Sequence, residues 1–105
     1  MKERMKALES LIDAHSRNRT LSSHEAQKLL DEYFNGLLYL MCELNDSNPV
    51  NNDNTFEHGP LNFNERLQYI EARKYHFMGY QQMKTMCIEI QKMLAIKNIK
   101  KKRQH

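Results

Sequence analysis

The sequence has few of the residues that interrupt regular structure, with three glycines and two prolines among its 105 residues. This scarcity argues against a β-rich fold, because the many turns of such a fold draw on glycine and proline. Residues that favour helices (lysine, glutamate, leucine, methionine, glutamine and alanine) dominate instead. We therefore expect an all-α fold that forms one small domain.

Long apolar runs and disulfide frameworks are also missing. No apolar run approaches the roughly 18 residues that a membrane-spanning helix needs, and the charged N-terminal residues do not resemble a secretory signal. The two cysteines, Cys42 and Cys87, lie inside predicted helices, which is typical of reduced core thiols. These features predict a cytoplasmic protein that does not bind membranes.

Motifs of catalysis and cofactor binding are not found either. The histidines are scattered, without cysteine or carboxylate at the spacing of metal ligands. No glycine-rich phosphate loop is present, and no serine or cysteine stands beside a histidine as a nucleophile would. We expect no catalytic residue, no metal and no cofactor, and hence a protein that is not an enzyme.

Positive charge is concentrated at the C-terminus. The chain has a net charge of +3, but residues 92–105 contain six lysines and arginines and no acid, so residues 1–91 carry −3. The sequence thus describes a mildly acidic body with a basic end.

Three helices are predicted. Ser22 with Glu25, and Asn62 with Glu65, have the spacing of a helix-capping box. The asparagine-rich stretch before Asn62 has the composition of a loop, and Phe56 is the large apolar residue expected to pin it to the body. The expected organisation is a helix over 2–15, a helix over 22–45, a loop over 46–61, a helix over 62–99 and a basic tail over 100–105.

The last predicted helix has apolar residues on two opposite sides. Phe77, Met78, Ile88 and Ile99 fall near one side, with Phe63, Leu67 and Ile70. We expect the helix over 22–45 to cover one of the two sides as an antiparallel hairpin. The last helix is roughly 55–60 Å long at about 1.5 Å per residue, so apolar surface should stay exposed for a second copy or another protein to cover. The expected interface residues are Met83, Met86, Ile90, Met93 and Leu94. The alternative is that this helix ends earlier and the first helix covers it.

A polar and aromatic cluster lies in the middle of the same helix. Tyr69, Arg73, His76 and Tyr80 are spaced four, three and four residues apart, which places them on one face of a continuous helix. Such a face could hold a nucleotide or a protein partner through its charge and its stacking rings. The ordinary alternative is a helix–helix seam that buries the rings and leaves their hydroxyls wet. Gly79 lets a backbone or a ligand approach closely.

The basic end is a candidate for binding nucleic acid through phosphates. The alternative is a solvated helix end, where lysines suit the partial negative charge of the last carbonyls. The residues concerned are Lys97, Lys100, Lys101, Lys102 and Arg103.

The stretches "MCELNDSNP" and "NERLQYIEARKYHFMG" resemble the helical-hairpin domain of phage proteins that counter cyclic-nucleotide immune signalling. The resemblance spans about residues 20–90 and is carried by Glu65, Ile70, Ala72, Met78 and Gly79. It implies a symmetric homo-oligomer that sequesters cyclic nucleotide messengers. The long loop, the first helix and the basic tail depart from that family.

Three functions follow as hypotheses. The first is a small interaction or inhibitor protein, encoded by a phage or another mobile element, that binds and blocks a host defence protein. Seven methionines support adaptable protein contacts. The second is an oligomeric sponge for cyclic nucleotides, and the third is a nucleic-acid-associated regulator.

Overall fold

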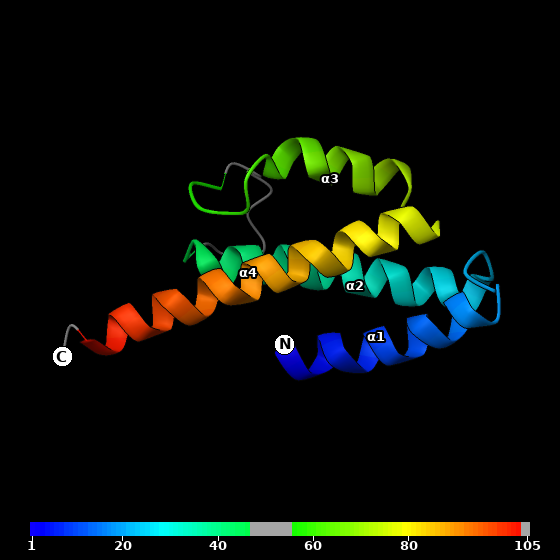
Figure 1. Cartoon of the computed structure of the whole chain (residues 1–105), viewed down its shortest axis with the longest axis horizontal. Coiled ribbons are helices and arrows are strands. Elements are labelled where there is room, and N and C mark those ends of the chain that lie inside the picture. The colour runs from blue at the N-terminus through cyan, green and yellow to red at the C-terminus, as the bar shows by residue number, and fades with distance from the viewer. Residues whose placement is uncertain (47–55, 104–105) are drawn as a thin grey trace.

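The computed structural model of the chain describes residues 1–46 and 56–103, and of Lys102 and Arg103 the backbone alone. Within these residues the structure is all-helical, which confirms the expected fold class (Figure 1). Its overall extents are 49 × 25 × 23 Å, so the molecule is elongated. The helices are α1 (Lys2–Arg17), α2 (His24–Leu44), α3 (Phe63–Ala72) and α4 (Phe77–Arg103).

The connection between α1 and α2 is a tight reversal. The chain leaves α1 through Arg19, which has a left-handed backbone with φ of 57°. The helix α2 then begins after Ser23, whose hydroxyl accepts a hydrogen bond from the Ala26 N–H at 3.2 Å. The expected cap at Ser22 is therefore wrong by one residue, since Ser23 satisfies the free N–H of the first turn. As a result α1 packs antiparallel to α2 (Figure 1).

The single helix expected over 62–99 is two helices, so this prediction is wrong. The chain leaves the helical path at Arg73 and re-enters it after His76. A Cβ built on Gly79 would lie 1.9 Å from the Arg73 carbonyl oxygen. The connection between α3 and α4 therefore comes so close to the start of α4 that only glycine fits at position 79. The close backbone approach expected at Gly79 is made by this turn.

The turn changes the direction of α4, and with it the topology. The antiparallel hairpin is formed by α3 and α4, whereas α4 runs parallel to α2 (Figure 1). Contacts fix this direction, because Tyr80 packs on Tyr33 near one end while Lys97 reaches Leu44 at the other. The predicted antiparallel pairing of residues 22–45 with the last helix is therefore wrong, since the chain reverses once more than expected.

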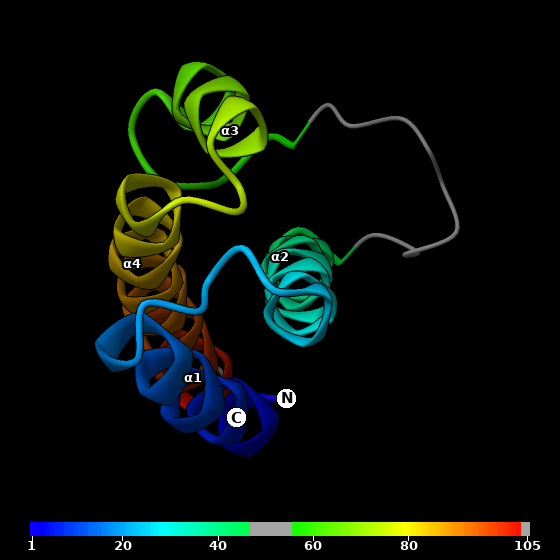
Figure 2. The ribbon, with the colours of Figure 1, turned by 90° about the vertical axis from the view of Figure 1, so that its right-hand side faces the viewer.

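The core lies where α1, α2 and α4 meet (Figure 2), and α3 lies along the first half of α4 (Figure 1). In α4 the buried side chains follow one face at helical spacing, which is the pattern of a helix packed on one side. The largest fully buried residues are Met5, Leu8, Ile12, Leu30, Tyr33, Leu37, Met41, Ile70, Tyr80, Met83, Met86 and Ile90.

The helix α4 is longer than the body it packs against. It has 27 residues against 21 in α2, which makes it roughly 40 Å long against roughly 31 Å at 1.5 Å per residue. Its last turns extend beyond the other helices (Figure 1). From Ala95 to Lys101 every residue except Lys97 is exposed.

Candidate functional site

The predicted face of Tyr69, Arg73, His76 and Tyr80 does not form, because the chain turns between the second and the fourth of them. Tyr80 is completely buried in the core. Its hydroxyl donates to Asp13 Oδ1 at 2.7 Å, and burial together with this contact raises its pKa. Tyr80 is thus a structural residue that joins α4 to α1.

The other three residues of that face lie on the surface near the turn. The Arg73 guanidinium stacks 4.1 Å from the centre of the Tyr69 ring, an arrangement that favours a cation over an aromatic face. His76 is exposed. The structure therefore brings Arg73 and Tyr69 together and separates both from Tyr80.

The predicted interface residues lie mostly inside the protein. Met83, Met86 and Ile90 are completely buried, while Met93 and Leu94 are partly buried against the same core. Met83, Met86 and Ile90 cannot serve as a contact surface for a partner, because the core of the single chain already buries them. This part of the site prediction is corrected: these residues form the inner face of α4.

The opposite side of α4 carries the exposed apolar residues. We call the set Phe77, Met78, Ile88, Ile96 and Ile99 the outer stripe; their exposed fractions are 48, 57, 53, 54 and 51%. Four of the five belong to the apolar side that the sequence pattern had already separated from the inner face, and Ile96 was missed. Two apolar sides on α4 are therefore confirmed.

The outer stripe is nearly straight. Phe77, Ile88 and Ile99 recur at intervals of about three helical turns, so their side chains lie along one line parallel to the axis. Gln81, Thr85 and Lys92 have positions between them on this side. The result is a long, narrow surface in which apolar residues alternate with polar ones.

A groove of about 700 Å³ lies at the far end of the molecule, beside the outer stripe. Leu44, Met93 and Ile96 supply its apolar surface. We call it the terminal groove. Its remaining lining residues are Asn45, Asp46, Glu57, His58, Lys97, Lys100 and Lys101.

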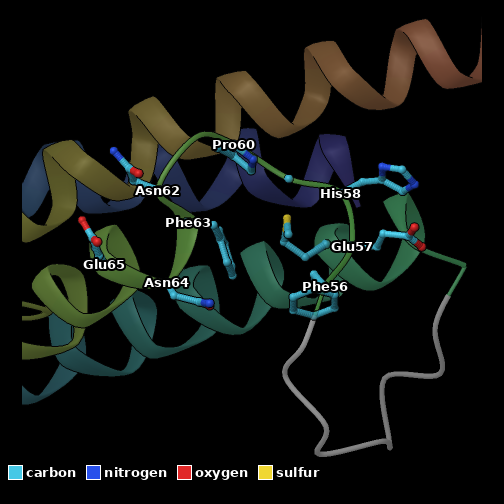
Figure 3. A pocket seen from close by; sticks show the side chains of 10 residues that line it. Phe56, Glu57, His58, Pro60, Asn62, Phe63, Asn64 and Glu65 are labelled. Atoms are coloured by element: carbon cyan, nitrogen blue, oxygen red, sulfur yellow. The ribbon is translucent and has the colours of Figure 1, made fainter.

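A second, smaller hollow of about 330 Å³ lies between residues 56–60 and the start of α3 (Figure 3). Phe56 packs edge-on against Phe63, with ring centres 5.9 Å apart, and is half-buried against the core. This confirms that Phe56 anchors the end of the loop. Of the predicted loop over 46–61, residues 47–55 lie outside the described residues.

The basic residues of the C-terminus have different surroundings. Lys97 Nζ donates to the carbonyl oxygens of Glu43 and Leu44 at 3.1 and 3.0 Å and to Asp46 at 2.8 Å. This lysine therefore caps the end of α2, and it lowers the pKa of Asp46. Lys100 and Lys101 are exposed. The side chains of Lys102 and Arg103 and the end of the predicted tail, residues 104–105, lie outside the described residues.

In residues 1–46 and 56–103, no group of three or more histidine, cysteine or acidic side chains could hold a metal ion. Cys42 and Cys87 are buried and free, and burial raises the pKa of the Cys87 thiol, which keeps it protonated and unreactive. None of the described helices is long and apolar enough to cross a membrane.

Comparison with known proteins gives the family. No curated protein and no solved structure matches the chain. The resemblance to phage anti-defence domains gains nothing from these comparisons and stays a prediction. A family model described as YpoC-like protein matches residues 1–102, almost the whole chain. The chain therefore belongs to the family of YpoC-like proteins.

Proposed function

We propose that this protein is a small, non-catalytic interaction protein of the cytoplasm that docks the outer stripe of α4 on another protein. The observation that carries the proposal is the exposure of five large apolar side chains along one side of a single helix. Single exposed apolar residues are normal on protein surfaces, but five of them on one side of a single helix indicate an interaction surface.

The stripe is not needed for the fold of the single chain. The inner face of α4, with Met83, Met86 and Ile90, already contributes its side chains to the core. The outer stripe exposes about half of each side chain on a helix that is already covered on its other side. A partner helix laid along the stripe would contact Phe77, Ile88 and Ile99, and helices are commonly recognised through apolar anchors on one face.

The proposal includes a blocking role, because a protein of one small domain acts most simply by covering a surface of its partner. The more specific idea, that the partner is a host defence protein and the chain comes from a phage or mobile element, rests on the resemblance to anti-defence domains alone. It is kept as a prediction.

The two alternative functions have less support from the geometry. A cyclic-nucleotide sponge would use Tyr80 beside Arg73, yet Tyr80 is buried and hydrogen-bonded to Asp13. A nucleic-acid regulator would use Lys97, yet this lysine caps α2. The remaining lysines stand beside Ile96 and Ile99, and such a mixture of apolar and cationic groups suits a protein better than a row of phosphates.

Site-specific photo-crosslinking tests the proposal. A photoreactive amino acid is placed at Lys92, which is exposed between Ile88 and Ile96 of the outer stripe, or at Lys28, which is exposed on α2. The full chain is then expressed and irradiated in cells that naturally produce it. We expect a defined protein adduct from position 92 and none from position 28.

Substitutions give the matched control. Ile88→Ser with Ile99→Ser should abolish the adduct, whereas Leu61→Ser should keep it, because Leu61 is the most exposed large apolar residue of the described part of the chain and lies outside α4. Equal adducts from both positions, or an adduct that survives the double substitution, would contradict the proposal.

A further inference from the structure

We infer that the terminal groove receives an acidic segment of the partner protein and seats one apolar side chain of that segment between Leu44, Met93 and Ile96. The inference deepens the proposed function and rests on it. It assigns a place and a chemistry to the partner, which the outer stripe alone does not.

The walls of the groove are held in place before any partner binds. The Asn45 side chain accepts a hydrogen bond from the His58 N–H at 2.7 Å and donates to the His58 carbonyl at 2.8 Å. This pair fixes the segment around His58 to the end of α2. Lys97 ties α4 to the same end of α2 through the carbonyls of Glu43 and Leu44. Because these walls are already ordered, the groove loses little conformational entropy when a partner binds.

The apolar surface of the groove comes from three side chains of different exposure. Leu44 is buried in the body, Met93 is partly buried, and Ile96 is half exposed. Methionine adapts its shape to a guest side chain more easily than branched residues do. A side chain of the partner with the size of leucine or methionine would cover these three residues and shield them from water.

The charges around the groove favour an acidic partner. Asp46 lies at the groove, but its carboxylate pairs with Lys97 at 2.8 Å. Lys100 and Lys101 are exposed on the α4 side and make no ion pair within the described residues. Glu57 is the acid that remains on the opposite wall, so an acidic segment is directed toward α4 and away from Glu57.

The charge pattern disfavours a second copy of the chain packed helix to helix on α4. Glu89 is the one acid of α4, and it already pairs with Arg66. The other charged residues of α4 are cations: Lys84, Lys92, Lys97, Lys100, Lys101, Lys102 and Arg103. Two α4 helices side by side would place lysines against lysines, which costs free energy.

A lipid surface is a poorer fit as well. A bilayer presents a broad face, whereas the groove is concave and is bounded by the segment around His58. Lys92 also lies on the apolar side of α4, among the residues of the outer stripe. An interfacial helix keeps its charges on the side opposite its apolar residues.

Solution NMR of the labelled full chain tests the inference with a defined probe. The probe is a synthetic helical peptide of leucine, alanine and glutamate, and its control replaces every glutamate with lysine. We expect amide shifts confined to residues 44–46, 57–58 and 93–101, and no shifts with the lysine peptide. High salt should weaken the binding, because Lys100 and Lys101 are exposed.

Variants separate the apolar and the charged contributions. Lys100→Glu with Lys101→Glu should weaken binding by about tenfold or more, which corresponds to about 1.4 kcal/mol. Lys2→Glu with Lys28→Glu changes the net charge equally at exposed sites that do not line the groove and should have little effect. Ile96→Ser should weaken binding of the peptide, while Leu61→Ser should not.

Several outcomes would overturn the inference. Shifts elsewhere in the chain, equal binding of the lysine peptide, or no binding at all would do so. Binding of vesicles that contain phosphatidylserine, lost in the Lys100 and Lys101 variant, would identify a lipid surface instead. Self-association that Ile96→Ser abolishes would identify a second copy as the occupant.

The result is separable from the test of the proposed function. If groove variants leave the adduct from position 92 unchanged and the peptide does not bind, the groove inference fails and the proposed function stands. If the peptide binds as expected while no adduct forms at the stripe, the proposed function fails at the stripe and the groove remains a binding site.

Discussion

The hydroxyl of Tyr80 donates to Asp13, whereas the hydroxyl of Tyr33, whose ring packs edge-on against Tyr80, has no hydrogen-bond partner among the described residues. Both rings are completely buried. Cys87 lies near Tyr33, but its sulfur is at best a weak hydrogen-bond acceptor. Two neighbouring phenols of the core therefore contribute differently to stability.

Removing the two hydroxyls should have different effects. Tyr80→Phe deletes a hydrogen bond to a charged acceptor and should lower the free energy of unfolding by about 1.5–3 kcal/mol. Tyr33→Phe deletes a buried polar group that has no partner and should be neutral or stabilising. Urea unfolding of both variants measures the difference, and equal losses would contradict the assignment.

Gly79→Ala should destabilise the protein although alanine favours helices. The new Cβ would meet the Arg73 carbonyl, so the turn between α3 and α4 must shift, at a cost of about 1–3 kcal/mol. Gly36→Ala is the matched control, because its Cβ meets the end of the flexible Met5 side chain. Thermal unfolding should show a clearly larger loss for Gly79→Ala than for Gly36→Ala.

The two sides of α4 should respond differently to the same substitution. Ile90 is completely buried and Ile88 is 53% exposed, two residues away on the other side. Ile90→Ala should cost about 2–5 kcal/mol through the cavity that it leaves. Ile88→Ala should change stability by no more than about 0.5 kcal/mol. Urea unfolding measures both, and a large loss at Ile88 would mean that the outer stripe is covered within the chain.

Acid should weaken the attachment of the turn between α3 and α4. Asp31 accepts hydrogen bonds from Lys74 Nζ and the Tyr75 hydroxyl, each at 2.8 Å. The Lys74 contact, with help from Tyr75, lowers the pKa of Asp31 below its ordinary value of 3.8. The folded protein thus holds this carboxylate ionised more strongly than the unfolded chain does.

The sign of the pH effect follows from this shift. The contribution of Asp31 to stability is fully present above pH 3.8 and is lost as pH falls through the lower, folded-state pKa. Asp31→Asn should remove that part of the acid dependence. Urea unfolding at a series of acidic pH values checks it, and an unchanged pH dependence in the variant would contradict the role of Asp31.

Helical periodicity was enough to predict the fold class and the division of α4 into two apolar sides. The inner face with Met86 and Ile90 and the outer stripe with Ile88 and Ile99 both follow from spacing near 3.6 residues. Periodicity does not say which side the rest of the chain covers. The interface was therefore assigned to the side that the structure buries.

The turn at Arg73–His76 could not be located from the sequence pattern. The residues around it have ordinary helix propensity, and the apolar spacing continues across it. Gly79 was the local signal, since it marks a close approach of backbone. The approaching group is a carbonyl six residues earlier in the same chain, and contacts made by Asp31, more than forty residues away, hold the turn. Tertiary contacts of this kind override local propensity.

The packing of α3 also divides the fold into two parts that can open at different free energies. This helix packs mainly on α4, with Ile70 as its one fully buried residue, while α1, α2 and α4 share the rest of the core. A transient detachment of α3 would therefore leave the three-helix body standing, as a partial opening with a lower free energy than global unfolding. Backbone amides of α3 should then exchange with solvent earlier than those of α2, and an opened α3 would uncover fresh apolar surface on the first half of α4.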